Sequence, residues 1–252
     1  MSDKKVAIIT GATAGIGCAV AKRLGQDGFI VILNGIDDAE GAKRVEELTA
    51  KGITAEYYGF DVTNEEAVTK NIKAIGEKYG RIDALVNNAG GLGGRSRFED
   101  MTTEFYRFVM ALNLDSVFFA SRAAIPYLKK GDHPTIINYT SNAGWNAGGP
   151  GAGIYGTSKA AVHTITRALA KDLAEYGIRV NAVSPGTIDT DFHKQIKSTK
   201  PEVFASWAKN IMLGRLGQPE DVAGVVSFLC SKDAAFLTAE TIQVGGGQAL
   251  GI

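Results

Sequence analysis

Short apolar runs alternate with segments of helical periodicity along the chain. The apolar runs are rich in Val and Ile and largely uninterrupted, which is typical of strands that a parallel sheet buries on both faces. Helical periodicity is clearest at Gly15–Asp27, Asn64–Tyr79, Ile154–Tyr176 and Pro219–Ser231. The alternation predicts an α/β fold, with a doubly wound parallel sheet of seven strands and helices on both faces. The predicted strands are Val6–Thr10, Ile30–Asn34, Thr54–Gly59, Ala84–Asn87, Thr135–Tyr139, Arg179–Ser184 and Thr241–Val244.

One connection is unusually long for a link between a strand and the next helix. Residues 187–217 have a polar start and an amphipathic middle, which predict a small helical lid over a substrate site. A surface insertion without a function is the alternative. Residues 1–252 contain no linker, internal repeat or low-complexity segment, so we predict a single domain.

Composition excludes several classes of protein. Lys plus Arg and Asp plus Glu both total 27, and a net charge of zero disfavours binding to nucleic acid. No apolar run approaches the roughly 20 residues of a membrane span, and the start of the chain lacks an apolar signal region. We therefore expect a cytoplasmic protein with no membrane partner. Cys18 and Cys230 are expected to be buried packing residues, and no cluster of Cys, His or carboxylate has the spacing of metal ligands.

A glycine-rich turn follows the first predicted strand and opens the first helix. Gly11 permits a tight turn, and Gly15 and Gly17 leave room where a pyrophosphate would meet the free N–H groups of a helix N-terminus. A tight turn without a ligand is the alternative. The predicted nucleotide contacts in this turn are Gly11, Thr13, Ala14, Gly15, Ile16 and Gly17.

Small and polar residues also follow three later strands, at the sheet edge where open α/β sheets bind ligands. Asp61 has an alternative reading as a helix N-cap, and the asparagine run at the fourth strand can be a plain turn. The family resemblance described below implies that the cofactor contacts at this edge are Asp61, Val62, Asn88, Ala89, Gly90, Pro185, Gly186, Ile188 and Thr190.

A serine, a tyrosine and a lysine form the strongest candidate for catalysis. Tyr155 and Lys159 stand four residues apart in a helical segment, so they share one face. A nearby ammonium favours a phenolate and lowers the phenol pKa from its usual value near 10. Ser141 follows the fifth strand at the same edge, and its hydroxyl can donate to a carbonyl oxygen while Tyr155 transfers a proton. A surface Tyr-Lys pair is the alternative for these two residues alone.

These motifs, in this order, resemble those of the short-chain dehydrogenase/reductase family, a single-domain Rossmann fold. The resemblance rests on the Gly-x-x-x-Gly-x-Gly spacing, the Asn87-Asn-Ala-Gly90 run, Ser141 and the Tyr155–Lys159 pair, and it extends to the last strand. There, Val244-Gly-Gly-Gly247 departs from the many relatives that carry Asp before the final glycine pair.

The resemblance implies hydride transfer between a nicotinamide cofactor and a carbonyl or alcohol, without a metal, in an enzyme that is usually a homotetramer. It implies that Tyr155 is the acid or base, that Lys159 lowers the Tyr155 pKa and binds the ribose, and that Ser141 orients the substrate. Asn113 would bind a water that links Lys159 to solvent; a helix kink at this poor helix former is compatible with that role.

The end of the second strand bears on the choice of cofactor. Asn34, Gly35 and Ile36, the predicted contacts, are followed by Asp37 and Asp38, and no basic residue is near to hold a 2′-phosphate. The Leu-Asn-Gly run is similar to that of NAD-using hydroxybutyrate dehydrogenases in the family. We predict NAD(H), with NADP(H) as the alternative.

The substrate is predicted from the loops around the candidate catalytic residues. Arg95 lies on a glycine-rich loop and could clamp a carboxylate, although a solvated loop charge is the alternative. We predict a small, polar substrate, anionic if Arg95 binds it, such as a keto acid or keto sugar. The chain looks similar to bacterial reductases of 4-deoxy-5-hexoseulose uronate type. Two alternatives are a 3-oxoacyl thioester reductase that uses NADPH and a non-catalytic nucleotide-binding sensor or scaffold. The predicted substrate contacts are Gly91, Arg95, Ser141, Asn142, Tyr155 and His193.

Overall fold

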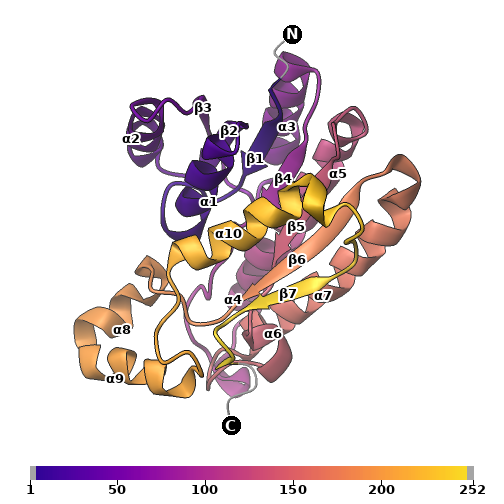
Figure 1. Ribbon diagram of the computed structural model, residues 1–252. Helices are drawn as coiled ribbons and strands as arrows, with labels where there is room; N and C mark the ends of the chain where they lie inside the picture. Colours follow the sequence, from indigo (N-terminus) through magenta and orange to yellow (C-terminus); the bar gives the residue numbers. More distant parts are fainter. Residues whose placement is uncertain (1–3, 249–252) are drawn as a thin grey trace.

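The computed structural model describes residues 4–248 and places seven parallel strands in one sheet (Figure 1). Their order is β3-β2-β1-β4-β5-β6-β7, so the chain winds outward from β1 in both directions. This is the doubly wound sheet that the alternation predicted. The strands are β1 (Val6–Ile9), β2 (Ile30–Gly35), β3 (Ala55–Gly59), β4 (Ala84–Asn87), β5 (Thr135–Tyr139), β6 (Arg179–Pro185) and β7 (Thr241–Val244).

Helices cover both faces of the sheet. Helices α1 (Gly15–Gln26), α2 (Asp38–Thr49) and α10 (Pro219–Cys230) pack on one face, and α3 (Glu65–Tyr79), α5 (Ser116–Leu128) and α7 (Gly153–Leu173) on the other. The shorter helices are α4 (Thr103–Met110), α6 (Ala143–Asn146), α8 (Lys194–Thr199) and α9 (Pro201–Ser206).

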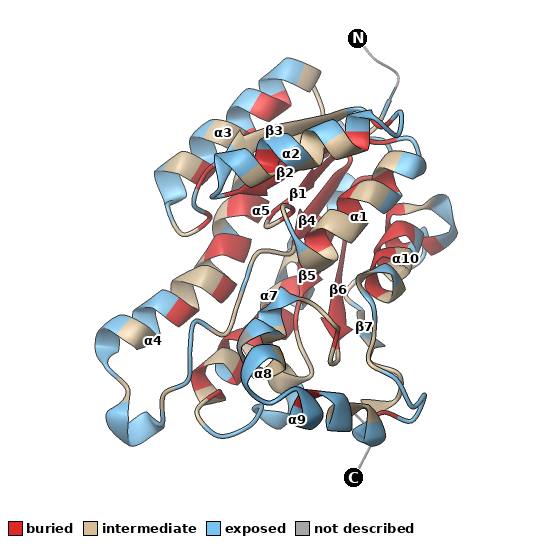
Figure 2. Ribbon diagram, turned by 90° about the vertical axis from the view of Figure 1, so that its left-hand side faces the viewer, coloured by how far each residue is buried: buried red, intermediate tan, exposed pale blue. Residues whose placement is uncertain are grey.

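The core follows from the alternation of side chains along each strand. In β1, Ala7 and Ile9 pack into the apolar cluster under α1 and α10, whereas Val6 and Ile8 pack into the cluster under α3 and α5. Figure 2 shows the inner strands of the sheet as buried, the edge strand β3 as mostly intermediate, and α8 and α9 as largely exposed. The sheet is therefore a fixed platform, and the segment between β6 and α10 lies outside it.

The predicted end of the sixth strand and the prediction for one cysteine need correction. The sixth strand continues through Pro185, which pairs with Val244 in the ladder. Proline is tolerated here because no hydrogen bond from its own nitrogen is needed. The Pro185 carbonyl accepts from the Asn142 N–H (3.2 Å), and the next N–H, that of Gly186, donates to the Val244 carbonyl (3.0 Å). Cys230 is buried as predicted, whereas Cys18 is only partly buried.

A helical stretch across α4 and α5 was not anticipated. The continuous helical stretch Thr103–Leu128 is long and apolar enough, by length and composition, to span a membrane. Its most apolar 18-residue segment has a mean hydropathy of 1.4, and 39% of that segment is buried in the fold. Core helices of soluble proteins meet the same test, so the feature is weak evidence for a span. In the sequence, Asp115 and Arg122 interrupt the apolar run and hide it.

Candidate active site

The glycine-rich turn forms a cradle that has no room for side chains. Gly11 and Gly15 adopt positive φ angles of 61° and 54°. A Cβ atom on Gly17 would lie 2.5 Å from the Asn88 amide nitrogen, which donates to the carbonyls of Thr10 (2.8 Å) and Gly11 (2.9 Å). Within the described chain, no side chain caps the N-terminus of α1. Its free N–H groups suit a pyrophosphate, so the site fits a dinucleotide.

The structure corrects the prediction for Asn34. This side chain is buried, and its amide nitrogen donates to the carbonyls of Phe60 (2.8 Å) and Tyr58 (3.3 Å) while its oxygen accepts from the Gly11 N–H (3.4 Å). The Asn34 side chain therefore fastens the glycine-rich turn to the end of β3 and is not free to bond a ribose. Gly35 ends β2, and the Ile36 side chain beyond it is 84% exposed.

Acidic groups surround the end of β2. Asp37 caps α2 by accepting from the Glu40 N–H (3.0 Å). Burial, followed by the charges of Asp38 and Asp37, raises the pKa of Tyr57 to about 12. The nearby cation Arg44 is paired with Glu40 (3.2 Å) and with a second glutamate of α2. The potential at this end of the sheet is therefore negative.

Asp61 is not a helix cap. Its Oδ1 accepts from the N–H and the hydroxyl of Thr63, both at 2.8 Å, and α3 is capped instead by Asn64, which accepts from the Ala67 N–H (3.0 Å). Asp61 is exposed at the carboxyl end of β3, whereas the Val62 side chain is buried. The alternative reading of Asp61 as an N-cap is thus wrong, and its second carboxylate oxygen can accept a ligand's hydrogen bond.

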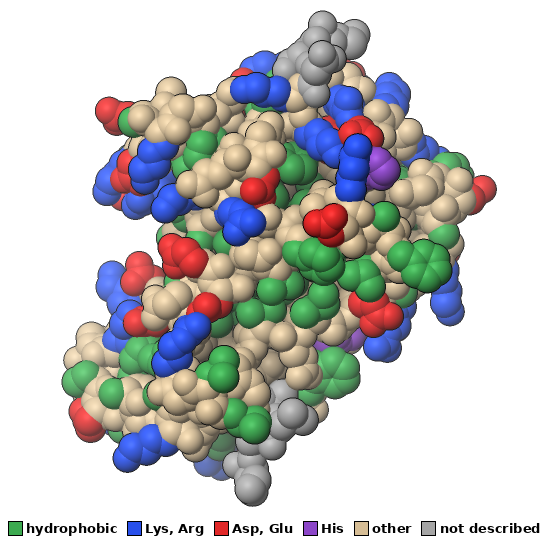
Figure 3. All heavy atoms as spheres, viewed as in Figure 1, with side chains coloured by type: hydrophobic (Ala, Val, Ile, Leu, Met, Phe, Trp, Pro, Cys, Tyr) green, Lys and Arg blue, Asp and Glu red, His purple; other side chains and the backbone are tan. Residues whose placement is uncertain are grey.

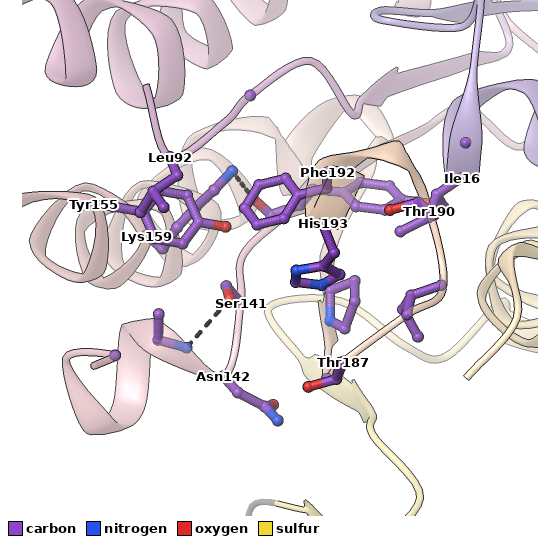
Figure 4. Close-up of a pocket in the computed structure, with 18 of the residues that line it drawn as sticks. Ile16, Leu92, Ser141, Asn142, Tyr155, Lys159, Thr187, Thr190, Phe192 and His193 are labelled. Carbon is purple, nitrogen blue, oxygen red and sulfur yellow. Dashed lines mark hydrogen bonds between the residues drawn. The ribbon is translucent and has the colours of Figure 1, made fainter. Parts of the chain in front are cut away.

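Helix α7 brings Tyr155 and Lys159 to the end of β5, where Ser141 follows the strand. The Lys159 side chain is buried, its Nζ donates to the Tyr139 carbonyl (2.9 Å), and it lies 5.9 Å from the centre of the Tyr155 ring. The Ser141 Oγ accepts from the Ala143 N–H (3.2 Å), and Ser141 lines the same cavity as Tyr155. Figure 4 shows these side chains around one pocket. The predicted trio is therefore brought together.

Burial controls the protonation of this trio. It raises the pKa of Tyr155, an effect that the hydrogen bond from Ser141 only partly opposes. Burial also lowers the pKa of Lys159 to about 8. The predicted lowering of the Tyr155 pKa is therefore not found in the protein alone, where desolvation of the phenolate is the largest effect. Tyr155 therefore holds its proton at neutral pH, which is the form that an acid needs.

Asn113 lies in a π-helical turn, Ala111–Asp115, between α4 and α5. Its amide nitrogen donates to the carbonyls of Gly91 and Val109 (both 2.9 Å), and its oxygen accepts from the Gly91 N–H (3.0 Å). A Cβ atom on Gly90 would lie 2.8 Å from the Asn113 oxygen and 2.9 Å from the Lys159 ammonium. Asn113 thus holds the loop after β4 beside Lys159, and the predicted kink is present.

A cavity of about 540 Å³ joins the cradle to this trio. Of the predicted contacts, its lining includes Gly11, Ala14, Gly15, Ile16, Gly17, Asn88, Gly90, Arg95, Ser141, Asn142, Tyr155, Lys159, Pro185, Gly186, Ile188, Thr190 and His193. Nine other predicted residues are not in that lining: Thr13, Asn34, Gly35, Ile36, Asp61, Val62, Ala89, Gly91 and Asn113. Lining residues that the sequence did not single out include Leu92, Asn146, Thr187, Phe192 and Gln248.

The substrate end of the cavity is built from three loops. The Arg95 guanidinium donates to the Pro150 carbonyl (2.8 Å), and the Ser96 N–H donates to the Gly151 carbonyl (3.0 Å), so the loop after β4 is joined to the loop before α7. His193 faces them from the lid, and burial, followed by the charge of Lys197, lowers its pKa. Arg95 therefore provides a cation near a neutral imidazole.

The long segment after β6 does form a helical excursion. The turn before α8, Asp191–His193, lines the cavity, and aromatic side chains connect this turn to α9. Phe192 lies 6.2 Å from Tyr155 and 5.0 Å from His193, measured between ring centres. His193 in turn contacts Phe204 and Trp207, at 5.5 and 5.3 Å.

Comparisons with known proteins agree with this geometry. Residues 11–249 match the family model described as enoyl-(acyl carrier protein) reductase. A diacetyl reductase [(S)-acetoin forming] of Staphylococcus aureus is 38% identical over 98% of each chain, and a 3-oxoacyl-[acyl-carrier-protein] reductase of Thermotoga maritima is 36% identical over 97% of this chain and 98% of that protein.

Solved structures extend the likeness to the whole fold. A short-chain type dehydrogenase/reductase from Mycobacterium ulcerans superposes with a TM-score of 0.92 at 30% identity, over 100% of this chain and 92% of that one. An aldohexose dehydrogenase from Thermoplasma acidophilum superposes with a TM-score of 0.88 at 34% identity, over 99% and 95% of the two chains. The chain belongs to the short-chain dehydrogenase/reductase family of NAD(P)-binding enzymes, and it is an oxidoreductase that acts on carbonyl or alcohol groups.

Proposed function

We propose that this enzyme reduces a small, polar ketone, a keto acid or a keto sugar, with NADH. The observation that carries the proposal is the position of Arg95, which lines the same cavity as Ser141 and Tyr155. A guanidinium can hold a carboxylate or several hydroxyls through paired N–H donors. Asn142, Asn146 and Thr187, which also line the cavity, add further polar groups.

In this reading each catalytic side chain has one task. The nicotinamide cofactor, when bound, supplies the hydride. Ser141 donates a hydrogen bond to the carbonyl oxygen and holds it near the Tyr155 hydroxyl. Tyr155, protonated at neutral pH, gives its proton to that oxygen as negative charge develops on it. The Lys159 ammonium, 5.9 Å from the ring centre, stabilises the phenolate that remains.

The preference for NADH is supported by the charges at the end of β2. Asp37 and Asp38 lie there, and Arg44 is engaged by glutamates of its own helix. A 2′-phosphate would meet net negative charge at this place, whereas a 2′-hydroxyl would not be repelled.

A second candidate is reduction of a 3-oxoacyl thioester with NADPH. It is supported by the 36% identity to the Thermotoga maritima reductase, whose name states a 3-oxoacyl substrate. The names of the diacetyl reductase and the aldohexose dehydrogenase state small, polar substrates instead. The Arg95 side chain favours a substrate that carries a carboxylate or several hydroxyls over a plain acyl chain, because its paired N–H donors need polar acceptors.

The test is oxidation of NADH and NADPH, side by side, with keto acids, keto sugars, diacetyl and a 3-oxoacyl thioester at neutral pH. We expect NADH and an anionic ketone to give the highest kcat/KM. Arg95→Met should raise KM for a keto acid about tenfold, the loss expected for one charge-assisted hydrogen bond, and leave KM for neutral diacetyl unchanged. Arg97→Met, an exposed arginine outside the cavity lining, is the matched control. A preference for NADPH and the thioester would overturn both parts of the proposal.

We also propose that the chain works as a cytoplasmic homotetramer. The support is a set of exposed apolar side chains outside the cavity: Phe108 and Phe118 on α4 and α5, and Phe228 and Phe236 near β7. Figure 3 shows hydrophobic side chains gathered around α10 and β7 on the face viewed. Light scattering after gel filtration would give the number of subunits, and a monomer would refute this proposal.

A further inference from the structure

Gln248 lies at the junction of three segments that meet beside the substrate end of the cavity. Its Oε1 accepts from the Thr187 N–H (2.8 Å) and from the Asn142 amide nitrogen (3.3 Å), and its Nε2 donates to the Thr187 hydroxyl (2.9 Å). All three residues line the cavity, and Figure 4 shows Asn142 and Thr187 side by side at its lower end. One carboxamide therefore joins the C-terminal turn to the loop after Ser141 and to the first residue of the lid.

The backbone around Gln248 is shaped to receive this carboxamide. A Cβ atom on Gly186 would lie 2.6 Å from the Gln248 Oε1 and 2.8 Å from the Cα atom of Gly245. Gly186 is therefore required by the packing of the C-terminal turn as well as by any ligand.

The C-terminal turn also holds the far end of the lid. The Leu213 N–H donates to the Gly246 carbonyl (3.1 Å). The two ends of the lid are joined as well, because the Gly217 N–H donates to the Thr187 carbonyl (3.0 Å) and the Asp189 N–H donates to the Gly217 carbonyl (2.8 Å). The lid thus starts and ends on a small hydrogen-bonded frame, and Gln248 is the side chain that ties the frame to Asn142.

We propose that Gln248 is a positioning residue for the substrate: it fixes Asn142 and Thr187 as one polar wall and so sets the shape and charge of the substrate end of the cavity. Because this wall carries no ionised side chain in Gln248, Asn142 or Thr187, an anionic substrate meets dipoles there and a cation, Arg95, within the same cavity. For the identity of the substrate, this proposal rests on the proposed function. The hydrogen bonds between Gln248 and the first residue of the lid do not depend on that function.

The first test measures how the hydrogen bonds of Gln248 hold the lid, independently of the reaction. Gln248→Leu removes all three hydrogen bonds, so hydrogen exchange should rise at the Thr187 amide and across residues 187–217. Gln248→Glu keeps an acceptor for Thr187 and for Asn142, so exchange should stay close to wild type. Gln243→Leu, an exposed glutamine of β7, is the matched control and should leave lid exchange unchanged.

The second test measures how the polar wall affects KM and kcat. Gln248→Leu should raise KM for the ketone about tenfold, the effect of one to two lost hydrogen bonds, with kcat and the NADH dissociation constant within about twofold of wild type. Gln248→Glu should raise KM for a keto acid more than KM for diacetyl, because it places a carboxylate in the wall. A merely structural role would instead lower the activity toward both substrates equally.

Each outcome decides the proposal. Unchanged lid exchange in Gln248→Leu overturns it, even if no ketone in the panel is reduced. Equal effects of Gln248→Glu on the two substrates overturn the claim about charge and leave the proposed function intact. Failure of every ketone as a substrate, with the exchange result as expected, overturns the proposed function and leaves Gln248 as the tie of the lid. Should Gln248→Leu fail to fold, Gln248→Asn, which is too short to reach both partners, gives the same exchange test.

Discussion

The two sides of the active-site cavity are built in different ways. On one side, Ser141, Tyr155 and Lys159 are set by the end of β5 and by the 21-residue helix α7, and the Lys159 side chain is only 4% exposed. On the other side, α8 and α9 have six residues each and lie largely on the surface. Helices of that length are not stable by themselves in water, so their position depends on contacts with the rest of the chain.

This difference separates the reaction from its specificity. Proton transfer needs fixed distances, which a buried helix on a sheet can keep. Choice of substrate needs a surface that closes around a ligand, which a lid on aromatic contacts and a few hydrogen bonds can provide. We therefore expect substitutions on the α7 side to act on kcat and those on the lid side to act on KM.

The largest effect is expected from Tyr155→Phe. Loss of the phenol proton should lower kcat about a thousandfold, within the range for general acid catalysis, while NADH still binds because the ring keeps its place. Stopped-flow or steady-state oxidation of NADH gives kcat, and quenching of protein fluorescence gives the NADH dissociation constant. Tyr106→Phe, on the exposed side of α4, is the control. Full biological function of the Tyr155→Phe protein would instead support a nucleotide-binding sensor.

The second effect concerns pH and has two opposite signs. Burial lowers the pKa of Lys159 from 10.5 to about 8, so its ammonium is lost as the pH rises through 8. Above that pH, kcat/KM for NADH, which reports the free enzyme, should fall about tenfold per pH unit. The contribution of Lys159 to stability should change the other way. Between pH 8 and 10.5 this side chain binds more protons in the unfolded chain than in the folded one, so its contribution to the free energy of unfolding rises with pH.

Lys159→Met is the control for both signs. The unfolding free energy of the wild type relative to that of Lys159→Met, measured by urea denaturation, should rise over that range, and the variant should keep a low activity without the fall near pH 8. A wild-type profile that stays flat to pH 10 would contradict the assignment of the titrating group to Lys159.

The α7 side of the site could be predicted from sequence because it is encoded by local constraints. A Tyr and a Lys four residues apart must share a helix face, and Gly17 must lack a side chain where Asn88 packs against it. Position along the chain was a poorer guide to the role of Asn34. This residue lies at the end of β2, as predicted, but its side-chain amide donates to the carbonyls of Tyr58 and Phe60 at the end of β3. The order of strands predicts where a residue lies but not which backbone groups its side chain bonds.

The lid was predicted from the sequence, but the contacts that hold it were not, because they join distant parts of the chain. Gln248 meets Asn142 across 106 residues, a pairing that neither periodicity nor motif spacing contains. The only signal was its place, since it follows the last strand at the same sheet edge as every other site residue. Desolvation was hidden too, because the rise in the Tyr155 pKa comes from burial that forms only in the fold.

An intermediate effect is expected at His193, whose ring contacts three aromatic side chains of the lid. His193→Ala removes these contacts, so KM for the ketone should rise about fivefold while kcat and NADH binding stay near wild type. The surface residue His133→Ala is the control. A fall in kcat comparable to that of Tyr155→Phe would break the division between the two sides, because it would place His193 in the proton transfer.

The smallest effect is expected from the ion pair within the lid, Lys197 with Asp189 at 2.5 Å. Both side chains are about one-third exposed, so water and salt screen the pair, and such pairs contribute about 0.2–1 kcal/mol. Lys197→Met should therefore change KM by less than about threefold, and the double variant with Asp189→Asn should add almost nothing further. Wild-type KM should shift by the same small factor in 0.5 M salt (about a 4 Å screening length), and the Lys197→Met protein should not respond to it. A larger effect would mean that this one pair, rather than the aromatic contacts and Gln248, holds the lid in place.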